Sequence, residues 1–308
     1  MMESFLTVGR QIITLYLLMA AGYMLGKVKL IDDRGSLCIS NLVMYVVSPC
    51  MMLVAFQRPL ERELLHEFVI MLGVALLLHA AFIILSRLLI REKDAHRRSL
   101  LLFGSVFTNC GFMGYPLMAA LFGTIGVFYG SAYVVVFTFL SWTYGIYAMT
   151  GDRSQLKLRP LFMNPGVISI VLAMALFLLQ ITLPEILMVP ITYLADLNTP
   201  LPMVVVGYQL SHADFRAALR GAGSWVSLLL RLVAFPLLTL GICLALDLDS
   251  RLTVITVIAA SAPPAALMSM FSAKFKLDTA LASSTVSVQT AFSALTMPLM
   301  VSLANYLA

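Results

Sequence analysis

Long apolar stretches recur along the whole chain, and short polar connections separate them. A helix needs about 20 apolar residues to cross the hydrocarbon core of a bilayer, and the stretches have roughly that length. The pattern predicts an all-α polytopic membrane protein with about ten membrane-spanning helices. Their predicted ranges, in chain order, are 4–26, 34–56, 65–90, 98–122, 125–149, 163–182, 187–210, 222–245, 251–275 and 278–303.

Composition and charge agree with a membrane location and predict an orientation. Of 308 residues, 61% are hydrophobic and 11% are charged, and the net charge is +5. The basic residues lie in short loops and not on one face, which argues against a nucleic-acid partner. Loops rich in Lys and Arg face the cytoplasm. The connections after predicted spans one, three, five, seven and nine hold Lys27, Lys29, Arg34, Arg87, Arg91, Lys93, Arg97, Arg98, Arg153, Lys157, Arg159, Arg216, Arg220, Lys274 and Lys276.

The opposite connections hold only Arg58, Arg62 and Arg251. We therefore predict an integral membrane protein with both termini on the outer side of the membrane.

Two halves of the chain resemble each other. The segment "VVSPCMMLVAF", 46–56, aligns with "LNTPLPMVVVG", 197–207, at an offset of about 151 residues. A similar offset pairs Asn109 with Ser261, Gly111 with Pro263 and His79 with Arg231. Each unit has about five spans, and an odd number forces the second unit to enter the membrane from the opposite side. The prediction is a pair of inverted five-helix repeats, 1–149 and 163–308, joined by a short cytoplasmic linker, 150–162.

Two of the predicted spans contain helix-breaking residues. Span four reads "FTNCGFMGYPLM", in which Pro116, Gly111 and Gly114 weaken the helix, and span nine reads "IAASAPPAALMSM", with Pro263 and Pro264. Breaks at equivalent positions of two inverted halves indicate a binding site near the bilayer midplane. Helix N-termini directed at one point favour an anion. The side chains of Asn109, Thr108 and Ser261 add hydrogen bonds; the alternative is a pair of proline kinks without a ligand.

A few other polar residues lie at predicted membrane depth. Arg231 either attracts an anion or is a snorkelling or carbonyl-paired arginine. His79 is read as a packing histidine or a proton relay, and Asp196 as a structural or a coupling carboxylate. Gln289 belongs to a polar span ten that either packs closely or lines a cavity. Neither broken span holds an acidic residue, which argues against proton coupling through a carboxylate there and leaves sodium coupling or uniport open.

Several of these segments resemble those of a known family. The motif "NCGFMGYPLMAALFG" in span four, the prolines of span nine, and "SNLVMYVVSPCMML" with its counterpart "PLPMVVVGYQL" are similar to bacterial members of the auxin efflux carrier family. The resemblance implies the fold shared with bile-acid/sodium symporters. In that fold, spans one, two, six and seven form a scaffold, and spans three to five and eight to ten form a moving transport domain.

The resemblance also implies that substrate binds where spans four and nine cross. Asn109, Pro116, Pro263 and Pro264 are then the crossover residues, while Ser261 stands where a second asparagine would make the contacts symmetric. Plant members carry auxin, and several bacterial ones carry small carboxylates. The long cytoplasmic loop of many plant members is absent.

The predicted function is secondary transport of small organic anions, such as mono- or dicarboxylates, by alternating access. The resemblance to bacterial members implies a bacterial inner membrane, so that both termini would be periplasmic. The candidate substrate-binding residues are Thr108, Asn109, Gly111, Pro116, Arg231, Ser261, Pro263, Pro264 and Gln289, with His79 and Asp196 as candidate coupling residues.

Other readings stay open. They are a sodium-coupled symporter of the bile-acid type and a membrane receptor or sensor for a small molecule. An enzyme is the weakest alternative, because no convincing catalytic set lies near Asp196, His79 or His212. No cofactor or metal is predicted, since the four cysteines lack ligand spacing. The expected partners are the substrate, the lipid bilayer, a coupling proton or sodium ion, and a second copy bound through the scaffold.

Overall fold

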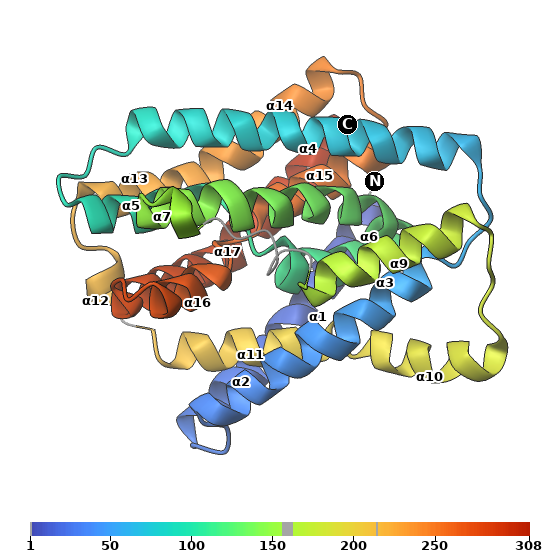
Figure 1. The fold of residues 1–308 in the computed structure, drawn as a ribbon, viewed down its shortest axis with the longest axis horizontal. Helices are drawn as coiled ribbons and strands as arrows, with labels where there is room; N and C mark the ends of the chain where they lie inside the picture. Colours follow the sequence, from blue (N-terminus) through green and yellow to red (C-terminus); the bar gives the residue numbers. More distant parts are fainter. Residues whose placement is uncertain (1, 156–162, 214) are drawn as a thin grey trace.

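The computed structural model describes residues 2–155, 163–213 and 215–308, and its regular elements there are all helices (Figure 1). Of the predicted linker 150–162, residues 156–162 lie outside the described residues, and Lys157 and Arg159 with them. The elements of the first half are α1 (Met2–Lys27), α2 (Asp33–Leu42), η1 (Val43–Val47), α3 (Ser48–Phe56), α4 (Arg62–Leu89), α5 (Ala95–Val106), η2 (Cys110–Gly114), α6 (Tyr115–Leu140), η3 (Ser141–Gly145), α7 (Ile146–Thr150) and η4 (Arg153–Gln155).

The second half continues in the same way, with helices interrupted by short turns. Its elements are α9 (Pro165–Leu178), α10 (Glu185–Asp196), α11 (Pro200–Ser211), α12 (Phe215–Ala218), α13 (Ala222–Leu229), η5 (Leu230–Ala234), α14 (Phe235–Ala245), α15 (Ser250–Ser261), α16 (Leu267–Lys274) and α17 (Thr279–Leu307).

Six continuous helical segments of the described chain are long and apolar enough to cross a membrane. These segments are Asp33–Phe56, Arg62–Leu89, Cys110–Thr150, Glu185–Ser211, Ala222–Ala245 and Thr279–Leu307, and the shorter apolar helices are Ile13–Lys27, Pro165–Leu178 and Ser250–Ser261. The all-helical membrane fold is therefore confirmed. Within Cys110–Thr150 the chain turns at Gly123, whose φ of 63° is left-handed. The sequence pattern places the boundary between spans four and five at that point.

Proline governs the helical geometry inside several of these segments. Three of the described π turns, η1, η2 and η5, are each followed by a proline in the second position of the next helix: Pro49, Pro116 and Pro236. Proline has no N–H to donate to the preceding turn, and its ring crowds a carbonyl there. A π turn widens the backbone and gives the ring room, so the helix continues through the proline without a break.

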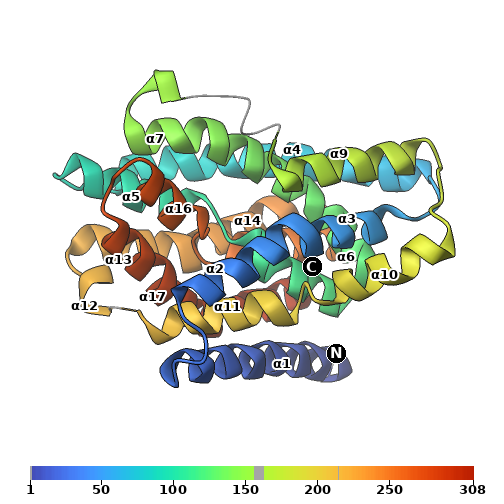
Figure 2. The same ribbon diagram turned by 60° about the horizontal axis from the view of Figure 1, so that its bottom comes forward.

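The closest helix–helix contact joins the two halves of the chain. Figure 2 shows α1 at one edge of the molecule beside α11. A Cβ added to Gly207 would lie 1.9 Å from the Met19 carbonyl oxygen, and one added to Gly22 would lie 2.2 Å from that of Val204. Small residues allow membrane helices to approach this closely because their backbones touch directly. On the same side of the molecule, α3 packs against α9 and α10.

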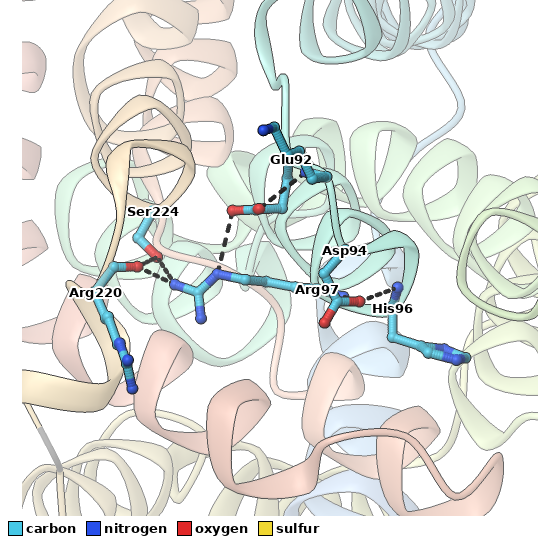
Figure 3. A network of polar contacts seen from close by, with 7 residues as sticks. Glu92, Asp94, His96, Arg97, Arg220 and Ser224 are labelled. Atoms are coloured by element: carbon cyan, nitrogen blue, oxygen red, sulfur yellow. Dashed lines mark hydrogen bonds and ion pairs between the residues drawn. The ribbon is translucent and has the colours of Figure 1, made fainter.

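A polar network joins the first turn of α5, and the connection before it, to the start of α13 (Figure 3). The Arg97 guanidinium lies 3.3 Å from the Glu92 carboxylate and donates to the Ser224 hydroxyl at 2.8 Å and to the Arg220 carbonyl. Asp94 caps the start of α5 by accepting from the backbone N–H of His96 at 2.9 Å. These contacts fix the end of α5 that is opposite to its interruption.

Candidate functional site

The first interruption of a helix lies where α5 ends. That helix stops at Val106, the chain is non-helical over 107–109, and η2 then begins at Cys110 and runs into α6. Pro116, which the sequence suggested as the breaking residue, lies in the first turn of α6, beyond the interruption. The physical reason is the π turn before it, which accommodates the proline ring.

The second interruption lies where α15 ends. This helix stops at Ser261, and α16 begins at Leu267 after a non-helical segment, 262–266, that contains Pro263 and Pro264. A residue before proline avoids the helical conformation, which explains why the helix ends here. When the two halves are matched by the ends of α5 and α15, Ser261 corresponds to Val106. The sequence alignment instead pairs Ser261 with Asn109.

The two interrupted segments pair with each other. Thr108 and Pro264 form an antiparallel bridge, the only β pairing among the described residues. The Asn109 N–H donates to the Pro263 carbonyl at 2.7 Å, and the Ala265 N–H donates to the Phe107 carbonyl at 2.9 Å. Backbone groups that left their own helices thereby satisfy one another, as groups at membrane depth must.

On one side of this pairing is a cavity of about 320 Å³. One part of its wall comes from the paired segments and the helices that continue them, α6 and α16. The other part comes from α2, α3, α9 and α11. Its described lining residues are Leu37, Ser40, Asn41, Met44, Ser48, Met52, Thr108, Asn109, Gly111, Phe112, Tyr115, Val134, Phe137, Thr138, Trp142, Asn164, Gly166, Ser169, Ile170, Gln209, Ala265, Ala266, Leu267 and Met270.

The polar groups of the cavity are neutral. None of the described lining residues is acidic or basic. Asn41, Asn109 and Gln209 contribute carboxamides that have no hydrogen-bond partner among the described residues, while the Asn164 carboxamide accepts from the Gly166 N–H at 2.8 Å. Carboxamides both donate and accept, so these three can bind a polar ligand without a formal charge.

Two helix N-termini also end at the cavity. Asn109 is the N-cap of η2, and Ala266 is the N-cap of α16; neither gives a side-chain cap to its helix. The first turn of a helix leaves N–H groups without intrahelical partners and carries partial positive charge. The cavity is therefore electrostatically suited to an anion although no basic side chain lines it.

The predicted site residues divide into two groups. Thr108, Asn109 and Gly111 line the cavity, and the Thr108 hydroxyl is buried without a hydrogen-bond partner. The other candidates do not line it. Those residues are Pro116, Arg231, Ser261, Pro263, Pro264, Gln289, His79 and Asp196.

The residues away from the cavity have their own contacts. Gln289 donates to the Ser227 hydroxyl at 3.5 Å, and the buried ring of His79 bonds through Nδ1 to the Ala75 carbonyl at 2.8 Å. Asp196 ends α10 and is exposed on the surface of the protein. Arg231 is fully buried and donates to the carbonyls of Ser105, Val106 and Ala260.

Several cavity residues were missed by the reasoning from sequence. Asn41 and Gln209 are polar residues within predicted spans two and seven, and each stands inside a segment that we compared with the family. A polar side chain in an apolar span is a functional candidate by default, so this signal was present. Asn164 is the N-cap of α9 and Trp142 lies in the π turn η3, and neither residue type carries a special signal at such a position.

These features define an integral membrane protein with a cavity at two interrupted helices, lined by apolar side chains and a few neutral polar ones. Residues 7–301 match the family described as membrane transport protein, and the chain belongs to that family, which confirms the prediction of an auxin efflux carrier family member. The chain is 24% identical to an uncharacterized transporter of Methanocaldococcus jannaschii over 302 residues, or 94% of this chain and 96% of the relative. An uncharacterized transporter of Methanothermobacter thermautotrophicus is 24% identical over 294 residues, or 94% and 95%. The protein is a membrane transporter.

Proposed function

We propose that this transporter is a secondary carrier of small organic anions, such as mono- or dicarboxylates, that binds its substrate where the two interrupted helices pair. The observation that carries the proposal is the cavity at that point. It combines two uncapped helix N-termini with the free carboxamide of Asn109. Its volume of about 320 Å³ is near the lower end of small-molecule sites, which fits a compact substrate.

The position of the cavity supports alternating access. Its wall on one side belongs to helices of the predicted scaffold, with Asn41 of α2 and Gln209 of α11. Its wall on the other side belongs to the predicted transport domain, with Asn109 before η2 and Leu267 of α16. A substrate held between two such bodies changes its accessible side when one body moves against the other.

The inverted repeat of ten spans is part of the same proposal. Ser48-Pro49 begins α3, and Pro200 begins α11 after its N-cap Thr199, at the places that the sequence alignment pairs. The Ser48 hydroxyl donates to the Asn198 carboxamide at 3.3 Å, so the two matching segments also meet in space. The turn at Gly123 supports the division of Cys110–Thr150 into two spans. Under this proposal both termini face the periplasm of a bacterial inner membrane.

Solid-supported membrane currents test the proposal. Purified protein in liposomes meets concentration jumps of a carboxylate panel, with sodium replaced by choline and pH varied, so that the same traces report the coupling ion. A saturating current for one acid that falls about tenfold or more in Asn109→Ala supports binding at the cavity. Asn305→Ala is the matched control, because Asn305 is an exposed amide far along α17 and outside the cavity.

Two outcomes contradict the proposal. Equal currents in the wild type and Asn109→Ala would remove this asparagine from the site. Absence of both current and radiolabelled exchange for every acid of the panel, with folded protein, would favour a receptor that binds without flux. Assembly as a homodimer through the scaffold is a separate prediction, which native mass measurement in detergent micelles checks.

A further inference from the structure

On the side of the paired segments away from the cavity wall, backbone carbonyls converge on one side chain. Arg231 donates from one terminal nitrogen to the carbonyls of Ser105, at 2.9 Å, and Val106, at 3.2 Å, and from the other to the carbonyl of Ala260. The first two carbonyls belong to the last turn of α5, and the third to the last turn of α15. The last turn of a helix leaves carbonyls unpaired and carries partial negative charge. Arg231 therefore neutralises both helix ends at once.

The surroundings of Arg231 keep its guanidinium in this place. The side chain is 0% exposed and lies over the rings of Phe82 and Phe235, at 5.5 and 5.7 Å from their centroids. Those two rings stack on each other at 4.3 Å. Cation–π contacts of this kind stabilise a desolvated guanidinium, and a buried charge with carbonyl and aromatic partners is stable at membrane depth.

Carbonyls at the ends of interrupted helices are also the ligands with which secondary carriers bind an inorganic cation. Here the oxygens of Ser105, Val106 and Ala260 already bind a cation that belongs to the chain. The planar guanidinium donates in fixed directions, so it holds the ends of α5 and α15 in register. That register sets the separation of the two helix N-termini that follow, at η2 and α16.

We propose that Arg231 is a positioning residue that serves as a tethered cation for the two helix ends and makes the site independent of sodium. The transport consequence rests on the proposed function, whereas the binding of a cation by the three carbonyls does not. The proposal predicts that truncation of the side chain leaves a carbonyl-lined place that free guanidinium ion enters. It also predicts that sodium neither stabilises the wild type nor drives its flux.

The experiment measures the thermal unfolding midpoint of purified protein in detergent with about 10 mM guanidinium chloride, sodium chloride or choline chloride. Arg231→Ala is expected to unfold at a lower midpoint than the wild type and to regain about 2 °C or more with guanidinium only. Arg58→Ala is the matched control. Arg58 also donates to a helix-end carbonyl, that of Ala55 at 2.7 Å, and lies over the Phe128 ring, but it is partly exposed at the end of α3.

Several results would overturn the proposal. Equal stabilisation of Arg231→Ala and Arg58→Ala by guanidinium would show a non-specific effect. Stabilisation of the wild type by sodium relative to choline would show a separate cation site. If Arg231→Ala gives no folded protein, Arg231→Lys and Arg231→Met decide. The lysine variant retains the charge and is expected to unfold at a midpoint several degrees above the methionine variant. Equal midpoints for these two variants would refute a role for the charge.

The substrate is not needed for these measurements, so the two proposals fail separately. Guanidinium rescue without any carboxylate current or radiolabelled exchange would leave the tethered cation standing and remove the anion carrier. A carboxylate current that requires sodium would leave the anion carrier standing and remove the sodium independence that Arg231 is proposed to provide.

Discussion

The helix ends on the two sides of the paired segments differ in whether a side chain of the protein neutralises their partial charge. Toward the cavity, η2 and α16 begin with N-termini that no side chain caps, and the described lining residues are uncharged. Away from it, α5 and α15 finish with C-termini whose carbonyls bind the guanidinium of Arg231. Both pairs of ends belong to the same two interruptions, yet only the negative pair is neutralised inside the protein.

Under the proposed function, this difference accounts for the binding of an anion in a cavity without basic side chains. The partial positive charge of the two N-termini stays available because nothing internal compensates it. The partial negative charge of the C-termini, a few residues away, would otherwise oppose it and is cancelled by Arg231. A positive side chain in the cavity itself would bind a carboxylate more tightly, and release is part of transport. Neutral amides and helix ends suit a site that must let its ligand go.

The largest effect is expected from a reversal of charge on the side away from the cavity. Arg231→Glu places a carboxylate against three carbonyl oxygens and two negative helix ends. We expect a loss of roughly 5 kcal/mol or more, enough to prevent recovery of folded protein. Fluorescence-detected size-exclusion chromatography checks this, with Arg58→Glu as control. A monodisperse Arg231→Glu protein with an unchanged unfolding midpoint would show that the helix ends need no cation.

A charge on the cavity side should leave the fold and remove binding. Asn109→Asp puts a negative group at the N-cap of η2, where a carboxylate is accepted by the helix but repels an anionic ligand. We expect apparent affinity to fall on the order of a hundredfold at neutral pH. Protonation of the new carboxyl restores a neutral donor and acceptor, so affinity should recover as pH falls. Currents measured between about pH 7 and pH 4, a range that reaches the ordinary pKa of an aspartate, test the sign with the wild type in parallel; an equal fall at both ends of the range would contradict it.

The sequence allows the interruptions to be predicted, but not the contacts of Arg231. Prolines and glycines have backbone consequences that are local, so "APP" in span nine marks the end of α15 directly. Pro116 was misleading because the π turn of η2 absorbs its effect on the helix, and no side-chain pattern announces that turn. The partners of Arg231 are carbonyls, which every residue has. Residue types therefore predict neither which carbonyls contact Arg231 nor that these carbonyls converge on its guanidinium.

The cavity was predictable in part for a similar reason. Thr108, Asn109 and Gly111 adjoin an interruption, so the break itself identified them. Asn41 and Gln209 belong to distant spans, and their place in the same wall depends on how α2 and α11 pack. A polar residue in an apolar span gave the signal, but only the packing shows which cavity it faces.

An intermediate effect is expected from the scaffold wall. Gln209→Leu removes a free carboxamide of the cavity and keeps a similar side-chain volume. If the amide bonds the ligand, affinity should fall roughly tenfold, the usual worth of one lost hydrogen bond to a charged group. Gln57→Leu, an amide that bonds the Ile181 carbonyl at 3.2 Å outside the cavity, is the control. An unchanged Gln209→Leu protein would remove α11 from the site and leave Asn41 as the free carboxamide of the scaffold wall.

The smallest effect tests the space beside the helix N-terminus of η2. A Cβ added to Gly111 meets no atom within 4 Å, so Gly111→Ala should fold normally and place a methyl group in the cavity. We expect affinity to fall by about threefold to tenfold for the largest acid that is carried and to change little for the smallest, because one methyl group narrows the site. Gly73→Ala is the matched control, since a Cβ there also meets nothing within 4 Å and Gly73 lies on the exposed face of α4. A graded loss with acid size would place the substrate against the uncapped N-terminus. An equal loss for all acids would indicate a disturbed backbone instead, and no loss for any acid would move the substrate toward the opposite wall of the cavity.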